Sequence, residues 1–377
     1  MPGSTLRRFG LARLPLLISD ALMSSAARSD DYQWIGGNGS FLDGDNWNQG
    51  GDVPGVTGTD DTFSVSTDGA SPLITLAGDV DISAGSGLVE DVDPLGLATL
   101  EHQSGVLSIG TLETGRDGFG EYRLAGPDAW LNVGHLALGV NVGSEGTFTN
   151  DGGQINVFGE TTLIVGDAGT GTFNQTSGTT NDTSLILGNQ ETGDGTVNLS
   201  GGTISITGDA IVGNAGEGYF YHDNLDDSAA VAVGGRLILG AQTDSHGEYE
   251  LLDSESGRDS TLITNGTVVG QSGVGMFVQD GGLHQVGSIV QAADLVLGED
   301  ASGDGTYIMN GGALVAEDNG SRIFVGFDGH GEFTLNDGAV STADLYVGGW
   351  YDFCTNTGHY GTGVFTQNGG DVSTGGL

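Results

Sequence analysis

The sequence predicts an all-β chain that winds into a right-handed parallel β-solenoid (β-helix) of about ten coils of ~26 residues. Three observations predict this fold. A short apolar phrase ending in glycine returns ten times, a second glycine-rich phrase follows it at a nearly fixed offset, and no segment carries the 3.6-residue apolar period of a helix. One such unit cannot bury a core alone, whereas stacked units can.

The first phrase is two or three apolar residues followed by glycine. Its ten copies end at Gly110, Gly139, Gly166, Gly188, Gly213, Gly240, Gly270, Gly298, Gly326 and Gly348. The 238 residues from the first of these glycines to the last divide into nine intervals, which average about 26 residues. Short apolar runs closed by glycine are typical of strands that end in tight turns. We therefore expect one strand and one corner at each copy.

The second phrase is Gly-x-[Phe/Tyr/Val], followed four or five residues later by another glycine, which is usually paired. Gly146-Thr147-Phe148 leads to Gly152-Gly153, and Gly305-Thr306-Tyr307 leads to Gly311-Gly312. We expect a second strand and a second corner here, with inward apolar side chains stacked in columns along the rod. Glycine makes up 72 of the 377 residues, and we expect many of them at corners, some with positive φ.

The chain divides into three segments by composition. Residues 1–27 are predicted to be a secretory signal peptide, because a positive start precedes a short apolar stretch and small residues. The residues that indicate it are Arg7, Arg8, Arg13, Leu14, Leu16, Leu17, Ile18, Ser25, Ala26 and Ala27. Residues 28–100 are expected to form an N-terminal cap and the first irregular coils, with Trp34 and Trp47 packed inside the cap. Residues 101–377 are expected to be the solenoid repeats.

Two features bear on the end of the chain and on membranes. The last repeat has only begun at Gly375-Gly376-Leu377, as expected of a solenoid truncated at its carboxyl end. No segment after the predicted signal approaches ~18 consecutive apolar residues, so we expect no membrane-spanning segment in the mature chain.

The charge balance excludes several classes of partner. The chain has 50 acidic residues, nine arginines and no lysine, and its formal net charge is −41. Such a surface repels nucleic acid and anionic membranes, so neither is expected as a partner. The single cysteine, Cys354, permits no intramolecular disulfide, which excludes a disulfide scaffold.

A family resemblance appears when the opening residues are added to the repeats. Residues 32–65 read Tyr32-Gln33-Trp34, Gly36-Gly37-Asn38-Gly39, Asn46-Trp47-Asn48, Pro54-Gly55 and Asp60-Asp61. With the two phrases above, residues 32–377 resemble the family of autotransporter- and PEP-CTERM-associated β-strand repeats. The resemblance implies a bacterial solenoid that is secreted or lies at the outer cell surface, often as an autotransporter passenger. It also implies adhesion or surface-layer roles. The sequence up to Leu377 departs from the family pattern, since it shows neither the alternating strands expected of a translocator barrel nor the apolar helix and basic cluster expected of a sorting tail.

One acidic run resembles the start of a Ca²⁺ loop. It reads Glu299-Asp300-Ala301-Ser302-Gly303-Asp304-Gly305, so Asp300, Ser302 and Asp304 are weak Ca²⁺ candidates. The twelfth position of such a loop falls on Gly311 and lacks the bidentate glutamate. We therefore assign no cofactor and expect diffuse association of cations with the acidic surface, with Ca²⁺ binding at these residues as the alternative.

An enzyme must be weighed because polysaccharide lyases and hydrolases also use solenoids of this shape. Asp226-Asp227 and His330-Gly331 match pieces of the pectin hydrolase signature, but they stand 104 residues apart. A lyase needs a basic residue near an acidic sugar, and the arginines of the repeats are scattered. The seven histidines at positions 102, 135, 222, 246, 284, 330 and 359 show no metal-ligand spacing and are expected to be isolated surface or turn residues. We assign no catalytic residue and no metal site.

The function predicted from these observations is non-catalytic. We expect a secreted or cell-surface solenoid with an adhesive or structural role, whose partners are cell-surface or extracellular matrix components, including carbohydrate. The aromatic insertion Trp350-Tyr351-Asp352-Phe353 with Tyr360 either contacts carbohydrate or packs on the solenoid flank. The alternatives are a secreted carbohydrate-active enzyme, either a lyase or a hydrolase, and a Ca²⁺-dependent extracellular scaffold.

Overall fold

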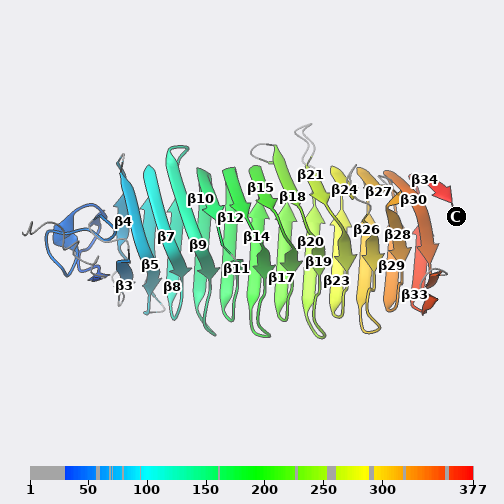
Figure 1. Ribbon diagram of the computed structural model, residues 1–377, viewed down its shortest axis with the longest axis horizontal. Helices are drawn as coiled ribbons and strands as arrows, with labels where there is room; N and C mark the ends of the chain where they lie inside the picture. Colours follow the sequence, from blue (N-terminus) through cyan, green and yellow to red (C-terminus); the bar gives the residue numbers. More distant parts are fainter. Residues whose placement is uncertain are drawn as a thin grey trace, which may run out of the picture.

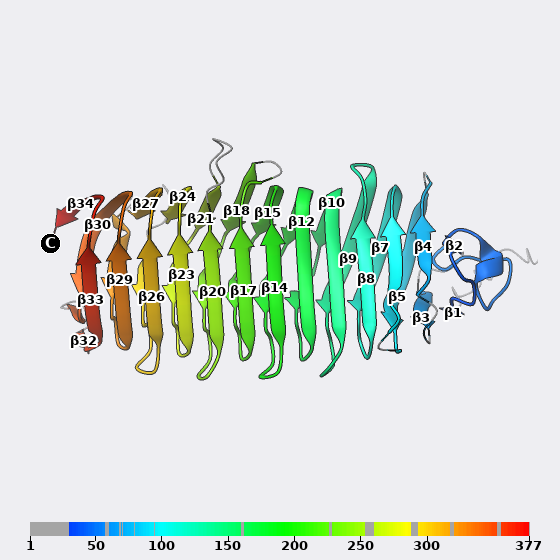
Figure 2. The same ribbon diagram turned by 180° about the vertical axis from the view of Figure 1, so that it is seen from behind.

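The protein is a long β-solenoid rod, seen here in a computed structural model (Figure 1, with the opposite side in Figure 2). The structure describes residues 30–376 except 57–59, 68, 70, 79, 94, 160–161, 226–227, 253–259, 288–292, 317–319 and 353–355. The predicted signal peptide and Cys354 therefore lie outside the described residues. The chain is all-β and forms about ten stacked parallel coils at a spacing of about 26 residues, which confirms the predicted fold class.

Each coil contributes strands to three faces of the rod, which we call faces A, B and C. Face A contains the Gly-x-[Phe/Tyr/Val] phrase, face C contains the apolar phrase, and face B lies between them in chain order. Face A contains β2 (Gly39–Ser40), β4 (Leu73–Leu76), β6 (Ala98–His102), β8 (Phe119–Leu124), β14 (Asp194–Leu199), β17 (Glu217–His222), β20 (His246–Leu251), β23 (Val274–Gln279), β26 (Asp304–Met309), β29 (His330–Leu335) and β33 (Thr362–Gln367). Face B contains β15 (Gly202–Ile206), β18 (Ala229–Val233), β21 (Thr261–Thr264), β24 (Leu283–Val286), β27 (Ala313–Ala316) and β34 (Asp371–Gly376).

Face C has the shortest strands, and six longer strands run through a corner from one face to the next. Face C contains β1 (Asp31–Gln33), β3 (Thr62–Thr67), β11 (Leu163–Val165), β13 (Leu185–Leu187), β16 (Ala210–Val212), β19 (Leu237–Leu239), β22 (Thr267–Val269), β25 (Leu295–Leu297) and β28 (Arg322–Val325). The strands that span faces B and C are β5 (Asp81–Asp91), β7 (Gly105–Thr114), β9 (Ala129–Leu138) and β30 (Ala339–Val347). Those that span faces A and B are β10 (Glu145–Val157) and β12 (Thr170–Asp182).

The register places equivalent residues of successive coils directly above one another. Phe148 of β10 lies opposite Tyr122 of β8 and Phe173 of β12. Because side chains alternate across a strand, this register keeps one set of residues inside the rod along its whole length. The alternating apolar residues that predicted the strands therefore form continuous internal columns.

An aromatic column fills the core beneath face A. Its rings stack nearly parallel, with centroids 4.6–5.3 Å apart between neighbouring coils. Its members are Tyr122, Phe148, Phe173, Phe220, Tyr249, Phe277, Tyr307, Phe333 and Phe365. Val197 occupies the corresponding position of β14 and interrupts the column. The side chains around it, Phe173 and Asp182 among them, leave no cavity large enough for a water molecule.

Glycine has two structural roles at the corner between faces C and A. Gly166, which ends an apolar phrase, has φ +70°, so it supplies the left-handed turn that the sequence predicts. Gly195 begins the next Gly-x-Val phrase inside strand β14, where a Cβ would collide with the carbonyl oxygen of Val165. The second glycine is therefore required for close packing and not for turning, a reason that the sequence pattern alone does not reveal.

The amino-terminal end is closed by a small aromatic cluster. Trp34, Phe41 and Trp47 are buried, and the rings of Trp34 and Phe41 pack edge-on against Trp47 at 5.0 and 4.9 Å. The indole nitrogen of Trp47 donates a hydrogen bond to the carbonyl of Phe41 at 2.9 Å, and a short 3-10 helix η1 (Gly44–Asn46) precedes it. This arrangement confirms the prediction that Trp34 and Trp47 belong to the packing of a cap.

One hairpin leaves the coil pattern near the carboxyl end. Strands β31 (Trp350–Asp352) and β32 (Thr357–His359) pair antiparallel and form a separate two-stranded sheet. Across the described part of the chain, no helix has the length and apolar character needed to cross a membrane.

Candidate functional site

The acidic turn proposed as a Ca²⁺ candidate lies at the corner between faces C and A. Asp300 and Ser302 are exposed in the turn, and both contact Ser272 of the preceding coil. The Ser272 hydroxyl donates to Oδ2 of Asp300 at 2.6 Å, and the Ser302 hydroxyl donates to the Ser272 carbonyl at 2.8 Å. Asp304 begins β26, where it pairs in register with Val274 and His330. Among the described residues, no three His, Cys, Asp or Glu side chains are grouped so as to hold a metal, and Ca²⁺ binding here stays a prediction.

Three histidines are buried in the core, which contradicts the expectation of isolated surface or turn residues. His102, His222 and His284 are fully buried. Each hydrogen-bonds through Nδ1 to the hydroxyl of a tyrosine in the aromatic column, at 2.8–3.0 Å. The partners are Tyr122, Tyr249 and Tyr307, respectively. Every tyrosine hydroxyl inside the column needs a polar partner, and a histidine supplies it in each of these three places.

Burial controls the protonation of these groups. Desolvation lowers the pKa of His102 and His222 to about 4 and that of His284 to about 3, since the core disfavours a charged imidazole. These side chains are therefore neutral structural partners of tyrosine at pH 7. Burial also raises the pKa of Asp182 to about 7, although its carboxylate accepts hydrogen bonds from the backbone N–H groups of Thr183, Ser184 and Leu163.

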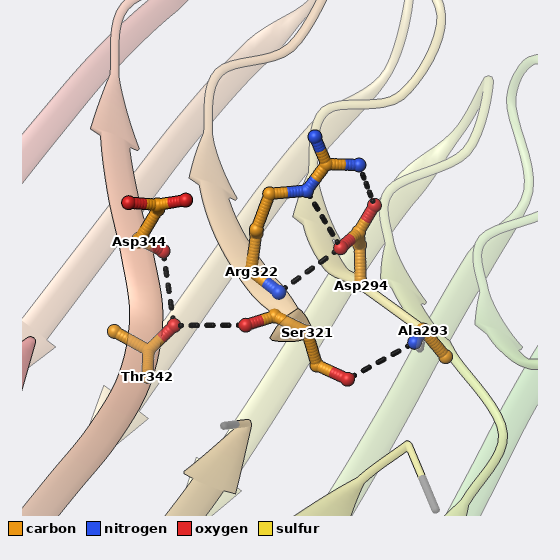
Figure 3. A network of polar contacts seen from close by, with 6 residues as sticks. All are labelled: Ala293, Asp294, Ser321, Arg322, Thr342 and Asp344. Atoms are coloured by element: carbon orange, nitrogen blue, oxygen red, sulfur yellow. Dashed lines mark hydrogen bonds and ion pairs between the residues drawn. The ribbon is translucent and has the colours of Figure 1, made fainter. Parts of the chain in front are cut away.

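The four described arginines all pair with carboxylates of the protein. Arg322 is the clearest case: its Nε and one terminal nitrogen donate to the two carboxylate oxygens of Asp294 at 3.2 and 2.9 Å (Figure 3). Arg116 pairs with Glu113, Arg236 with Glu299, and Arg123 lies 3.6–3.8 Å from Glu101 and Glu121. Arg116 and Arg123 lie seven residues apart near the amino-terminal end of the repeats, whereas Arg236 and Arg322 lie several coils further along the rod. The described arginines therefore do not gather into a basic cleft.

The aromatic insertion packs partly on the flank of face C. Trp350 lies against Phe324 and Tyr346, with ring centroids 5.6 and 6.1 Å away, and the Arg322 guanidinium lies over both Phe324 and Trp350. Of the two predictions for this insertion, packing on the solenoid flank is therefore the one that holds for Trp350. Tyr360 differs, because 83% of it is exposed.

Polar side chains form ladders on the outside of the rod. On face B, Asn156 donates to Asn132 at 2.9 Å and Asn181 donates to Asn156 at 3.0 Å. At the corner between faces A and B, Asn310, Asn336 and Asn368 each donate to the residue one coil before, at 2.7–2.8 Å. Such ladders repeat one hydrogen-bonding group at the spacing of the coils.

The structure also presents a residue that the sequence reasoning missed. Trp130 of β9 points outward from face B and is 43% exposed. It borders a groove of about 540 Å³ together with Gly78, Ser104, Gly105, Val106 and Asp128. The signal was present in the sequence: in Ala129-Trp130-Leu131-Asn132-Val133 the tryptophan occupies the outward, polar phase of the strand.

Only one of the two parts of the enzyme signature falls on described residues. Asp226-Asp227 lie outside the described residues. His330 is exposed at the start of β29 and hydrogen-bonds to Thr362 at 3.1 Å. Comparisons with protein-family models, with curated proteins and with solved structures give no match.

Proposed function

We propose that this protein is a non-catalytic β-solenoid of the outer cell surface or the extracellular space, where it acts in adhesion or in surface and matrix structure. The observation that carries the proposal is the repetition of outward-facing chemistry along a rigid rod. The asparagine ladders present the same amide group on successive coils. A repeated array of this kind favours many weak contacts acting together, which is how multivalent attachment gains strength.

The charge of the molecule supports the same proposal. A formal net charge of −41 keeps a rod of this size soluble and disfavours contact with nucleic acid or anionic lipid. The described arginines are engaged in ion pairs on the protein itself. Neutral cell-surface and matrix components, including neutral carbohydrate, are therefore the partners that this surface favours.

A bead-adhesion assay tests the proposal. Beads coated with the purified protein, and control beads coated with serum albumin, are exposed to bacterial cells and to extracellular matrix preparations in 0.15 M salt. Retention of the coated beads well above the control, falling steeply as the coating density is reduced, is expected for multivalent attachment. Retention equal to that of the control beads would contradict an adhesive role.

The two alternatives give different results in parallel measurements. A carbohydrate-active enzyme would release reducing ends or unsaturated sugars from polysaccharides incubated with the protein, whereas the proposal expects neither. A Ca²⁺-dependent scaffold would lose bead retention in EDTA and regain it with Ca²⁺ but not with Mg²⁺ at equal ionic strength. The proposal expects the same retention with either cation.

A further inference from the structure

We propose that the Trp130 groove is a binding site for a neutral polysaccharide chain, with the indole as a stacking platform and Asp128 as a hydrogen-bond acceptor. The inference rests on the proposed function, since it names one ligand class for the adhesive rod. Four features carry it: the exposure of the tryptophan, the shape of the groove, the polar groups at its edges and the charge of the surroundings.

The exposure of Trp130 has no structural purpose in the coil. Its register neighbours on face B are Val106 in the preceding coil and Gln154 in the next, so the position accepts small or polar side chains. Trp34 and Trp47 are buried in the cap, and Trp350 packs on face C. A tryptophan left 43% exposed on a flat sheet retains a large apolar face for another molecule.

Two glycines lie in the lining of the groove beside the indole. Gly78 and Gly105 line it, both with positive φ, and they lie where the chain turns from face A to face B. Ser104 is held there by Gly78, whose N–H donates to the serine hydroxyl at 2.9 Å. An added Cβ at Gly105 would collide with the carbonyl oxygens of Gly78 and Val80, so the turn beside the Trp130 ring excludes a side chain there. The volume of about 540 Å³ lies within the range of about 300–1,000 Å³ that is usual for ligand sites.

Polar groups flank the indole on two sides. Asp128 lines the groove, and its carboxylate makes no hydrogen bond or ion pair within the described part of the chain. On the other side, Asn132 accepts from Asn156 and donates toward Ser108 at 3.4 Å. This leaves the Asn132 amide one N–H and one lone pair for a ligand. An aromatic face between the Asp128 carboxylate and the partly engaged Asn132 amide matches a sugar ring, which offers C–H groups on its face and hydroxyls at its edge.

Charge decides between neutral and acidic sugars. Asp128 is negative, and the whole molecule carries a formal net charge of −41. An acidic polysaccharide would be repelled by this surface, whereas the hydroxyls of a neutral chain can donate to the carboxylate. The residues that line the groove come from three successive coils, so a chain of several sugars can extend along it.

Isothermal titration of the full chain with cellohexaose, xylohexaose and mannohexaose tests the site, with oligogalacturonate as the acidic probe. At least one neutral hexasaccharide is expected to bind, and oligogalacturonate is expected to bind far more weakly. Trp130→Ala should weaken binding on the order of tenfold or more. Trp130→Phe should retain most of the affinity, and Asp128→Asn should weaken binding severalfold without changing the melting temperature.

Ile263→Ala is the matched control, since Ile263 also points outward from face B and is 40% exposed several coils away. It should leave binding unchanged. The inference is overturned if none of the three neutral probes binds, if Trp130→Ala binds like the unmodified chain, if Ile263→Ala weakens binding equally, or if oligogalacturonate binds as tightly. Bead adhesion that persists without any hexasaccharide binding would overturn the site and leave the proposed function standing. Hexasaccharide binding through Trp130 without bead adhesion would do the reverse.

Discussion

The three buried histidines should make the rod lose stability as the pH falls from 7 to 4. Unfolded histidine has a pKa of 6.5, whereas burial lowers the pKa of His102 and His222 to about 4 and that of His284 to about 3. The stabilisation is complete above pH 6.5, where the histidines are neutral in both states. Below that pH the unfolded chain binds protons that the folded chain does not, so the free energy of unfolding falls until the folded pKa is reached.

The size of the loss follows from the distance between the two pKa values. At pH 4 each of the three histidines lowers the free energy of unfolding by about 3 kcal/mol relative to pH 7. Asp182 acts in the opposite direction, because burial raises its pKa to about 7. A raised carboxyl pKa gives stability that is present below pH 4 and lost as the pH rises through 7, so acidification recovers about 3 kcal/mol there. For these four groups the net loss at pH 4 is about 6 kcal/mol.

His284→Gln isolates one histidine. Glutamine keeps a polar group near the hydroxyl of Tyr307 but does not titrate. Urea unfolding followed by circular dichroism at pH 7, 6, 5 and 4 gives the free energy of unfolding for the variant and the unmodified chain. The two curves should converge by about 3 kcal/mol between pH 7 and pH 4, whatever their offset at pH 7. His330→Gln is the control, because His330 is exposed, and its curve should run parallel to that of the unmodified chain.

Parallel curves for His284→Gln and the unmodified chain would refute the reasoning, since they would mean that His284 gains a proton equally in both states. An equal change of slope in His330→Gln would also refute it, because that result would assign the pH dependence to surface charge and not to burial.

Three further predictions follow from the packing and the acidic turns. Val197→Phe should lower the melting temperature by roughly 2–4 °C, because the side chains around Val197 leave no room for a water molecule and the larger ring would overpack the core; a higher melting temperature would contradict this. Gly195→Ala should destabilise the rod by about 3 kcal/mol or more in urea unfolding, while Gly37→Ala, whose added Cβ meets nothing within 4 Å, should be nearly neutral. Equal millimolar concentrations of Ca²⁺ and Mg²⁺ should raise the melting temperature alike, and Asp300→Asn should not alter the response; a Ca²⁺-specific rise that Asp300→Asn removes would instead establish the predicted Ca²⁺ site.

The fold was predictable because the same two sequence phrases recur in each coil. Both phrases have the residue pattern of short strands, and their recurrence at a regular spacing indicates that these strands stack from coil to coil along the rod. Trp34 and Trp47 were predictable as cap residues because they precede the first regular strand. The roles of the two glycines were not separable, since Gly166 and Gly195 look alike in the sequence. Both lie too close to a neighbouring carbonyl for a side chain, but only Gly166 also turns the chain with a positive φ.

The polar interior and the exposed aromatic residue were not predicted, for one physical reason. His222 and His284 occupy inward strand positions. Because histidine side chains are usually exposed, the residue type predicted a surface position although the strand alternation predicted burial. Trp130 occupies an outward position of β9. Because tryptophan side chains are usually buried, its exposure was not predicted although the strand alternation places it outside. The inward–outward alternation of strand residues predicts the burial of all three correctly, because in a sheet with a fixed register this alternation decides which side chains are buried.

Strand phase also explains why the outward positions are where function is to be sought in this rod. An inward residue must fit the coils above and below it, and Phe277 illustrates this, since its ring lies 5.1 Å from Tyr249 and 4.6 Å from Tyr307. An outward residue packs against fewer neighbours, so its identity can vary from coil to coil except where asparagines form ladders. An exposed apolar residue on the outside of the rod adds nothing to the core and lowers solubility, so it indicates a ligand site more strongly than an inward residue does. Trp130 meets this description, because its neighbours in register, Val106 and Gln154, serve the same coil position with a small and a polar side chain.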